Sequence, residues 1–187
     1  AFLPLIVAQA LGFFVIFKKA ESTAWRESTA AFLFFAVGSS IALVAQIYNI
    51  PSSGGTFLLT WMFLCLPVIY LLRSSIMSLL VIIGITVYVN EVSYWTYTGK
   101  EAYLYWLFIG LIAPHYYLLV KKNPQSNFLV FHDWIIALSI TICLGSLSKD
   151  GEEIMFMGYL AMFGLFGVIG NTSRHQDKII INNPWRI

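Results

Sequence analysis

The chain has 187 residues, of which 59% are hydrophobic and 11% are charged. Soluble domains typically carry about 25% charged residues, so this composition excludes a soluble fold, which would lack the polar surface to cover itself. The formal net charge of +2 is too small to indicate a nucleic-acid partner. We therefore expect an integral membrane protein whose surroundings are the lipid bilayer.

Seven apolar stretches reach or approach the roughly 20 helical residues needed to cross a bilayer core of about 30 Å. The predicted spans are 1–17, 31–50, 56–72, 76–95, 102–120, 128–147 and 152–170. The predicted fold class is all-α, a polytopic transmembrane helical bundle that forms a single domain over residues 1–187. Near the end, Asn183 as N-cap and Pro184 at the first helical position are typical of a further helix. We expect the chain to be a fragment of a longer membrane protein.

Lys and Arg are distributed unevenly among the loops. Nine follow the odd-numbered spans, namely Lys18, Lys19, Arg26, Arg73, Lys121, Lys122, Arg174, Lys178 and Arg186. Two follow the even-numbered spans, namely Lys100 and Lys149. Short loops rich in basic residues stay in the cytoplasm. The pattern therefore predicts that loops 18–30, 73–75, 121–127 and 171–187 are cytoplasmic.

A small group of polar residues ends the second predicted span. Ser39, Ala42, Gln46 and Asn49 are three, four and three residues apart, so on a continuous helix they share one face, beside Tyr48. In lipid, small residues allow close helix contact, and amides form hydrogen bonds across it. We expect a helix-packing face, with a polar cavity open to the outside as the alternative.

The same region resembles a known family. Residues 36–50, AVGSSIALVAQIYNI, and residues 57–74, FLLTWMFLCLPVIYLLRS, are similar to bacterial predicted membrane proteins that carry the domain of unknown function 2157. The best match covers about residues 30–90. The chain departs from the family pattern with Ala45 in place of Gly and Asn49 in place of His. The resemblance implies a protein of the bacterial inner membrane and brings no catalytic residue with it.

Asp133 is the acidic residue embedded near a predicted span. Carboxylates inside membranes are costly and are candidates for a function by default. Asp133 also lies about five residues, or 7–8 Å at 1.5 Å per residue, from the predicted cytoplasmic end of its helix. Its position is compatible with an anchoring role, favoured by the helix dipole, and with proton or ion handling.

His115, His132 and His175 all lie toward the predicted cytoplasmic side. A zinc site needs three or four convergent ligands, and none of the three histidines has the i, i+4 pairing of a helical metal motif. We expect separate interfacial histidines, and neither a metal nor a cofactor.

The function is the least constrained part of the prediction. No motif pairs a nucleophile or a metal with a base, so we do not expect an enzyme. The abundance of small and aromatic residues favours a non-catalytic subunit that packs in a membrane protein complex or a homo-oligomer. The alternative is a small-solute or ion transporter or channel, with a polar cavity near Gln46, Asn49 and Asp133.

The loop charges generate a labelling prediction. In a cysteine-free background, single cysteines at Ser52 and Thr98 should react with impermeant thiol reagents added outside the cell, because both positions lie in acidic or neutral loops. Cysteines at Ser22 and Ser126 should not react. The opposite pattern of labelling would reverse the predicted orientation.

Overall fold

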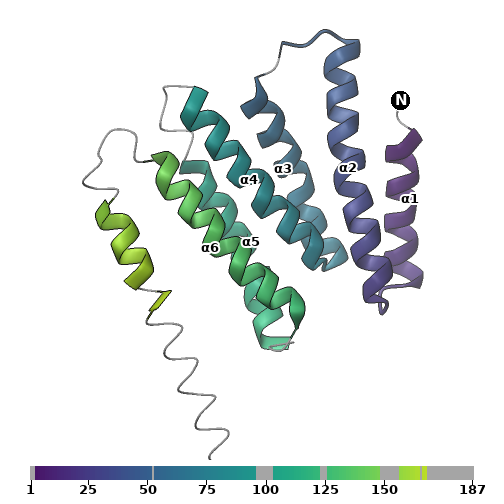
Figure 1. Cartoon of the computed structure of the whole chain (residues 1–187). Coiled ribbons are helices and arrows are strands. Elements are labelled where there is room, and N and C mark those ends of the chain that lie inside the picture. The colour runs from purple at the N-terminus through teal and green to yellow at the C-terminus, as the bar shows by residue number, and fades with distance from the viewer. Residues whose placement is uncertain are drawn as a thin grey trace, which may run out of the picture. The chain divides into compact units, whose positions relative to one another are not determined.

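The computed structural model of the chain describes residues 3–51, 53–95, 103–122, 126–147, 156–164 and 166–167. The chain divides into two units, residues 1–146 and 147–187, and each is described by itself. The described part contains six long helices: α1 (Leu3–Lys18), α2 (Thr23–Ile47), α3 (Gly54–Leu72), α4 (Ser75–Trp95), α5 (Leu104–Lys122) and α6 (Asn127–Leu147) (Figure 1). In the second unit, residues 156–164 and 166–167 are helical. The predicted all-α class is confirmed.

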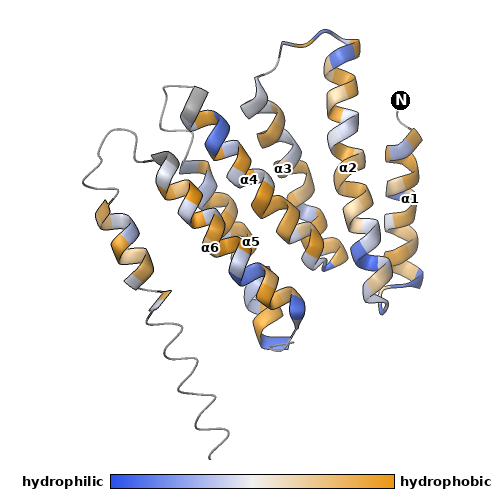
Figure 2. Cartoon of the chain, in the orientation of Figure 1, coloured by the Kyte–Doolittle hydropathy of each residue, from blue (hydrophilic) through white to orange (hydrophobic). Residues whose placement is uncertain are grey.

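Most of the predicted spans correspond to helices of sufficient length. Helices α2 to α6 are each long and apolar enough to cross a membrane, whereas α1 is a shorter apolar helix of 16 residues. Their surfaces expose large apolar side chains such as Phe13, Phe63 and Trp134, which suits contact with lipid. Figure 2 shows the hydrophobic residues along these helices. The length and the apolar composition of these helices are those of a multi-pass membrane protein. Much of the predicted span 152–170, and all of 171–187, lies outside the described residues.

Helix α2 differs from the prediction at both ends. It begins at Thr23, so the expected loop over 18–30 is wrong for its last eight residues, and the turn between α1 and α2 comprises residues 19–22 only. Hydropathy marks the apolar part of a helix and misses polar turns that continue it. The helix ends at Ile47, and Asn49 lies beyond it in the left-handed region, with φ of 50°. Asn49 therefore does not share a helical face with Ser39, Ala42 and Gln46.

Helix α4 is the core of the first unit. In its membrane-spanning window 61% of the residues are buried, against 17–28% in the other four long helices. It packs against α2, α3 and α5, and hydrogen bonds join it to α6. Its buried residues are apolar over most of its length, as expected of a helix covered on several sides. Met77, Val81, Ile85 and Val89 are fully buried.

Successive helices of the first unit run in opposite directions (Figure 1). The turns 19–22 and 73–74 join neighbouring helices at the same end of the unit as the connection between α5 and α6. Six cations therefore lie at that end, which we call the basic end: Lys18, Lys19, Arg26, Arg73, Lys121 and Lys122. The structure thus gathers the described basic loops on one side, as the charge pattern predicts.

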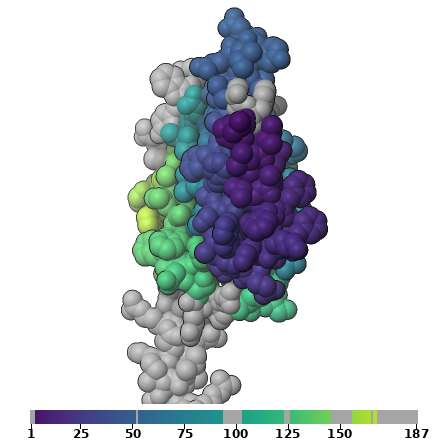
Figure 3. Space-filling view, turned by 90° about the vertical axis from the view of Figure 1, so that its right-hand side faces the viewer, coloured from purple at the N-terminus to yellow at the C-terminus, as the bar shows by residue number. Residues whose placement is uncertain are grey.

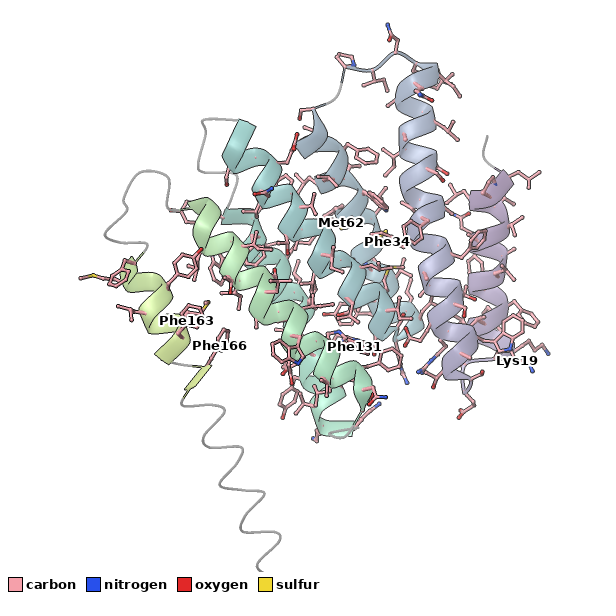
Figure 4. All side chains as sticks on the ribbon, in the orientation of Figure 1. Lys19, Phe34, Met62, Phe131, Phe163 and Phe166 are labelled. Carbon is pink, nitrogen blue, oxygen red and sulfur yellow. The ribbon has the colours of Figure 1, made fainter. Side chains whose placement is uncertain are left out.

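Helices α2 and α3 are in close contact at Gly38. The Trp61 indole Nε1 donates a hydrogen bond of 2.9 Å to the Phe34 carbonyl oxygen, and the Phe34 and Trp61 rings lie 4.6 Å apart. A Cβ atom on Gly38 would lie 2.4 Å from Trp61 Cε2. Figure 4 shows Phe34 on α2 and Met62 on α3, both within the packed helices. Only glycine leaves room here for the indole ring.

The substitution Gly38→Ala should destabilise the protein by about 1–3 kcal/mol, because the rigid Trp61 ring must move to make room for the methyl group. A matched control is Gly110→Ala on α5, where an added Cβ meets nothing within 4 Å. The control should be neutral or stabilising by up to about 1 kcal/mol through helix propensity. Unfolding of both variants in mixed detergent micelles would measure the difference, and equal losses would contradict the proposed packing constraint.

Candidate functional site

Polar side chains gather inside the first unit at the basic end, where α2 and α4 begin. The central residue is Glu27, in the second turn of α2, which is only 5% exposed. Its Oε1 accepts a hydrogen bond of 2.9 Å from the Ser75 amide, and its Oε2 accepts one of 2.8 Å from the Ile76 amide. The Ser74 hydroxyl also donates to Oε2.

These contacts fix the beginning of α4. The first amides of a helix have no partner within the helix, and the positive end of the helix dipole favours an anion there. Ser74 Oγ accepts a hydrogen bond of 3.1 Å from the Met77 amide, which is the usual bond of a serine N-cap. Glu27 supplies the remaining acceptors from another helix. The carboxylate is therefore compensated by three donors, and α2 is held to α4.

Two histidines lie together next to this contact. His132 is fully buried, and its Nε2 lies 2.9 Å from Ser78 Oγ while its Nδ1 lies 2.7 Å from the Phe128 carbonyl oxygen. Because a carbonyl oxygen only accepts, Nδ1 carries the hydrogen and Nε2 accepts from Ser78. The His115 ring centroid lies 6.3 Å from that of His132. The expectation of separate histidines is therefore wrong for this pair, while His175 lies outside the described residues.

Asp133 lies on the exposed side of α6 near this pair. Its Oδ1 accepts a hydrogen bond of 2.6 Å from the Tyr116 hydroxyl on α5. The bond joins α5 to α6 close to the connection between them. The contact suits the anchoring role more directly than ion handling, since the carboxylate already holds a neighbouring helix.

A cavity of about 480 Å³ opens among these helices at the basic end, and we call it the basic-end cavity. Its ionisable lining residues are Arg26, Glu27, Tyr70, Arg73, His115 and Lys122. Two buried nitrogen atoms there, Arg26 Nε and His115 Nε2, have no hydrogen-bond partner among the described residues. Volumes of about 300–1,000 Å³ are typical of small-molecule sites. This cavity is the candidate functional site.

A second polar cluster lies deeper in the unit, where α4, α5 and α6 meet. Ser139 Oγ lies 2.6 Å from Thr86 Oγ1 and 2.7 Å from the Tyr105 hydroxyl. Thr86 also donates to the Ile82 carbonyl oxygen at 2.7 Å. All three side chains are buried, and hydrogen bonds between spanning helices hold them together in the absence of water. This cluster is a structural link among three helices.

The polar residues predicted on α2 lie elsewhere. Ser39 and Gln46 are exposed on α2, Ser39 Oγ donates to the Ala36 carbonyl oxygen at 3.1 Å, and Tyr48 and Asn49 are exposed beyond the helix end. They lie at the end opposite to the basic end, whereas Asp133 lies in the second turn of α6 at the basic end. The structure therefore does not bring Gln46, Asn49 and Asp133 together. The packing role of the α2 face stays a prediction.

Sequence reasoning missed Glu27 because it lies in a stretch interpreted as a loop. One signal was present: Ser74 and Ser75 directly before an apolar run are typical of a helix start. Nothing local indicates that Glu27 supplies the acceptor, since it lies 47 residues from Ser74. Within the described residues, no group of three or more His, Cys, Asp or Glu side chains could hold a metal ion.

Glu27→Ala should lower the free energy of unfolding by about 2–4 kcal/mol, because buried donors at the start of α4 lose their acceptor. The control is Glu21→Ala, in the exposed turn 19–22, which should change stability by less than about 0.5 kcal/mol. The double variant Glu27→Ala and Ser74→Ala should lose less free energy of unfolding than the sum of the single variants, since both changes remove the same contact. Additive losses would show that the two residues act independently.

The comparisons with known proteins concern the part of the chain that forms this contact. The model of a family described as predicted membrane protein (DUF2157) matches residues 1–78. Comparison with the curated proteins and with the solved structures gives no match. The matched stretch starts earlier than the 30–90 expected from the motifs, and it includes both Glu27 and the beginning of α4. The resemblance is confirmed as a similarity of residues 1–78 to that family of predicted membrane proteins.

Proposed function

We propose that the chain is a non-catalytic membrane subunit that associates with a second copy of itself through α1. The observation that carries the proposal is Gln9, an exposed amide near the midpoint of α1. An amide in contact with lipid lacks hydrogen-bond partners. A partner helix that provides them would remove this cost.

The surroundings of Gln9 favour a helix as the partner. It borders an apolar groove of about 170 Å³ between α1, α2 and α3, which Gly12, Phe13, Leu33 and Val68 also line. A Cβ atom on Gly12 would meet nothing within 4 Å, so the groove is open at this glycine. Small residues allow close approach of membrane helices. Figure 3 shows α1 and part of α2 covering one face of the first unit.

A second copy fits Gln9 better than an unrelated helix of purely apolar character. The glutamine side chain both donates and accepts, so two Gln9 amides related by a two-fold axis can satisfy each other. Two-fold interfaces are the commonest in homo-oligomers. If a different membrane protein occupied this groove, the chain would still act as a non-catalytic membrane subunit.

The engaged polar groups of the basic end support a non-catalytic role. Glu27 caps α4, His132 bonds Ser78 and Phe128, and Asp133 bonds Tyr116. We also propose that the membrane is the bacterial inner membrane and that the basic end faces the cytoplasm, because basic loops are retained there.

Transport of a small solute or an ion is the second candidate function, and it rests on the polar residues Gln46, Asn49 and Asp133. These residues lie toward opposite ends of the first unit, so they would mark two ends of a pathway. The test is flux into liposomes that contain the purified protein. Flux abolished by Asp133→Asn would replace the subunit proposal with transport.

The oligomer proposal is tested by the mass of the protein particle after mild solubilisation. Gly12→Leu fills the groove and Gln9→Leu removes the amide, so each should weaken association by about three- to thirtyfold, the range of one interhelical hydrogen bond. Gly110→Leu on α5 is the control, because its Cβ also points into open space away from the groove. A protein that is monomeric throughout, or one whose mass is unchanged by both α1 variants, would contradict the proposal. A stoichiometric foreign subunit lost in both variants would identify a different occupant.

A further inference from the structure

We infer that the basic-end cavity binds a phosphate group. Three basic side chains line it: Arg26 from α2, Arg73 from the turn between α3 and α4, and Lys122 from the end of α5. Guanidinium groups recognise phosphate through paired hydrogen bonds, and lysine adds a mobile positive charge. The residues come from three separate segments and converge on one space.

These three cations face one carboxylate in the cavity. Glu27 is the carboxylate that lines the cavity, and its oxygens already accept bonds from Ser74, Ser75 and Ile76. No ion pair of Arg26, Arg73 or Lys122 occurs among the described residues. Asp133 is the nearby acid on α6, and it is bonded to Tyr116 rather than lining the space. Positive charge therefore exceeds negative charge in the cavity.

An unpartnered buried nitrogen points independently to a ligand. His115 is only 8% exposed and lines the cavity, yet its Nε2 has no hydrogen-bond partner among the described residues. Arg26 Nε lacks a partner in the same way. Buried polar atoms nearly always have partners, and those that do not require an explanation. A phosphate oxygen within the cavity would accept from both.

The backbone at Arg73 is consistent with a role for its side chain. Arg73 has φ of 49° and ψ of 43° at the C-cap of α3, a left-handed conformation in which glycine is the usual residue. An arginine there accepts an unfavourable backbone conformation at the rim of the cavity. Replacement by glycine removes the backbone strain together with the charge. A loss of binding in this variant would therefore not come from a loss of stability.

Phosphate chemistry has two sources at this position. The basic end lies at the membrane surface, where an anionic lipid headgroup reaches a pocket between spanning helices, and free phosphate or a phosphorylated solute reaches it from water. The volume of about 480 Å³ accommodates more than a bare phosphate ion. The same side chains would hold the phosphate in both cases.

The test uses the full chain, delipidated in neutral detergent. One arm titrates inorganic phosphate against sodium chloride of equal ionic strength. The other arm adds phosphatidylglycerol or phosphatidylcholine, with thermal unfolding and native mass spectrometry as readouts. We expect saturable stabilisation by inorganic phosphate or by phosphatidylglycerol. Stabilisation in the first arm identifies free phosphate as the source, and stabilisation by phosphatidylglycerol alone identifies the headgroup.

The variants show whether the site is the cavity. Arg73→Gly should weaken binding about tenfold or more while keeping the unliganded unfolding temperature, as one charge-assisted contact is lost. Lys121→Gln removes one positive charge at the same end, from a residue that does not line the cavity. Its binding affinity should stay within about twofold of that of the unchanged protein. Arg26→Gln removes another cation that lines the cavity and should also weaken binding, without any change at the turn that contains Arg73.

Two results would overturn the inference. The first is the absence of stabilisation by both phosphate and phosphatidylglycerol. The second is an equal loss of binding in Arg73→Gly and Lys121→Gln, which would show a general attraction to the charged end. Because Gln9 and Gly12 do not line this cavity, loss of the oligomer in their variants should leave the phosphate affinity unchanged, so the two proposals fail separately.

Discussion

A carboxylate is buried where helix α4 begins, and the arrangement of the first unit depends on it. Glu27 reaches from α2 to the Ser75 and Ile76 amides and to the Ser74 hydroxyl. Burying a charge is costly unless donors surround it, and the beginning of a helix offers such donors together with a favourable dipole. Since α4 is the most buried helix, fixing its first turn positions the helices that pack around it.

The same contact shapes the candidate site. Glu27 bonds the first amides of α4, and it is one carboxylate against the three cations Arg26, Arg73 and Lys122 at the cavity that they share. His132 and Asp133 are likewise bonded to neighbouring residues. The polar groups that hold the helices together are therefore distinct from the cations left available. This division explains how a structural cluster and the candidate cavity occupy one end of the unit.

The proposed interface has a different physical basis. In lipid, apolar contact alone gives helices little reason to associate, so hydrogen bonds and close packing decide where they do. Gln9 offers the hydrogen bond and Gly12 the open space, both on α1. The groove and the basic-end cavity share no lining residue. The proposed association in the membrane and the inferred binding of a phosphate group therefore do not depend on each other.

The sequence by itself determined the membrane class, five of the spanning helices and the gathering of basic loops at one end. These features follow from composition and from charge along neighbouring residues, which are local properties. The tertiary structure decided the start of α2, the pairing of Glu27 with α4, and the meeting of His115 with His132. Ser74 lies 47 residues from Glu27, and Ser78 lies 54 residues from His132. Local patterns carry no information on such partners, because only the packing of the helices brings them within hydrogen-bond distance.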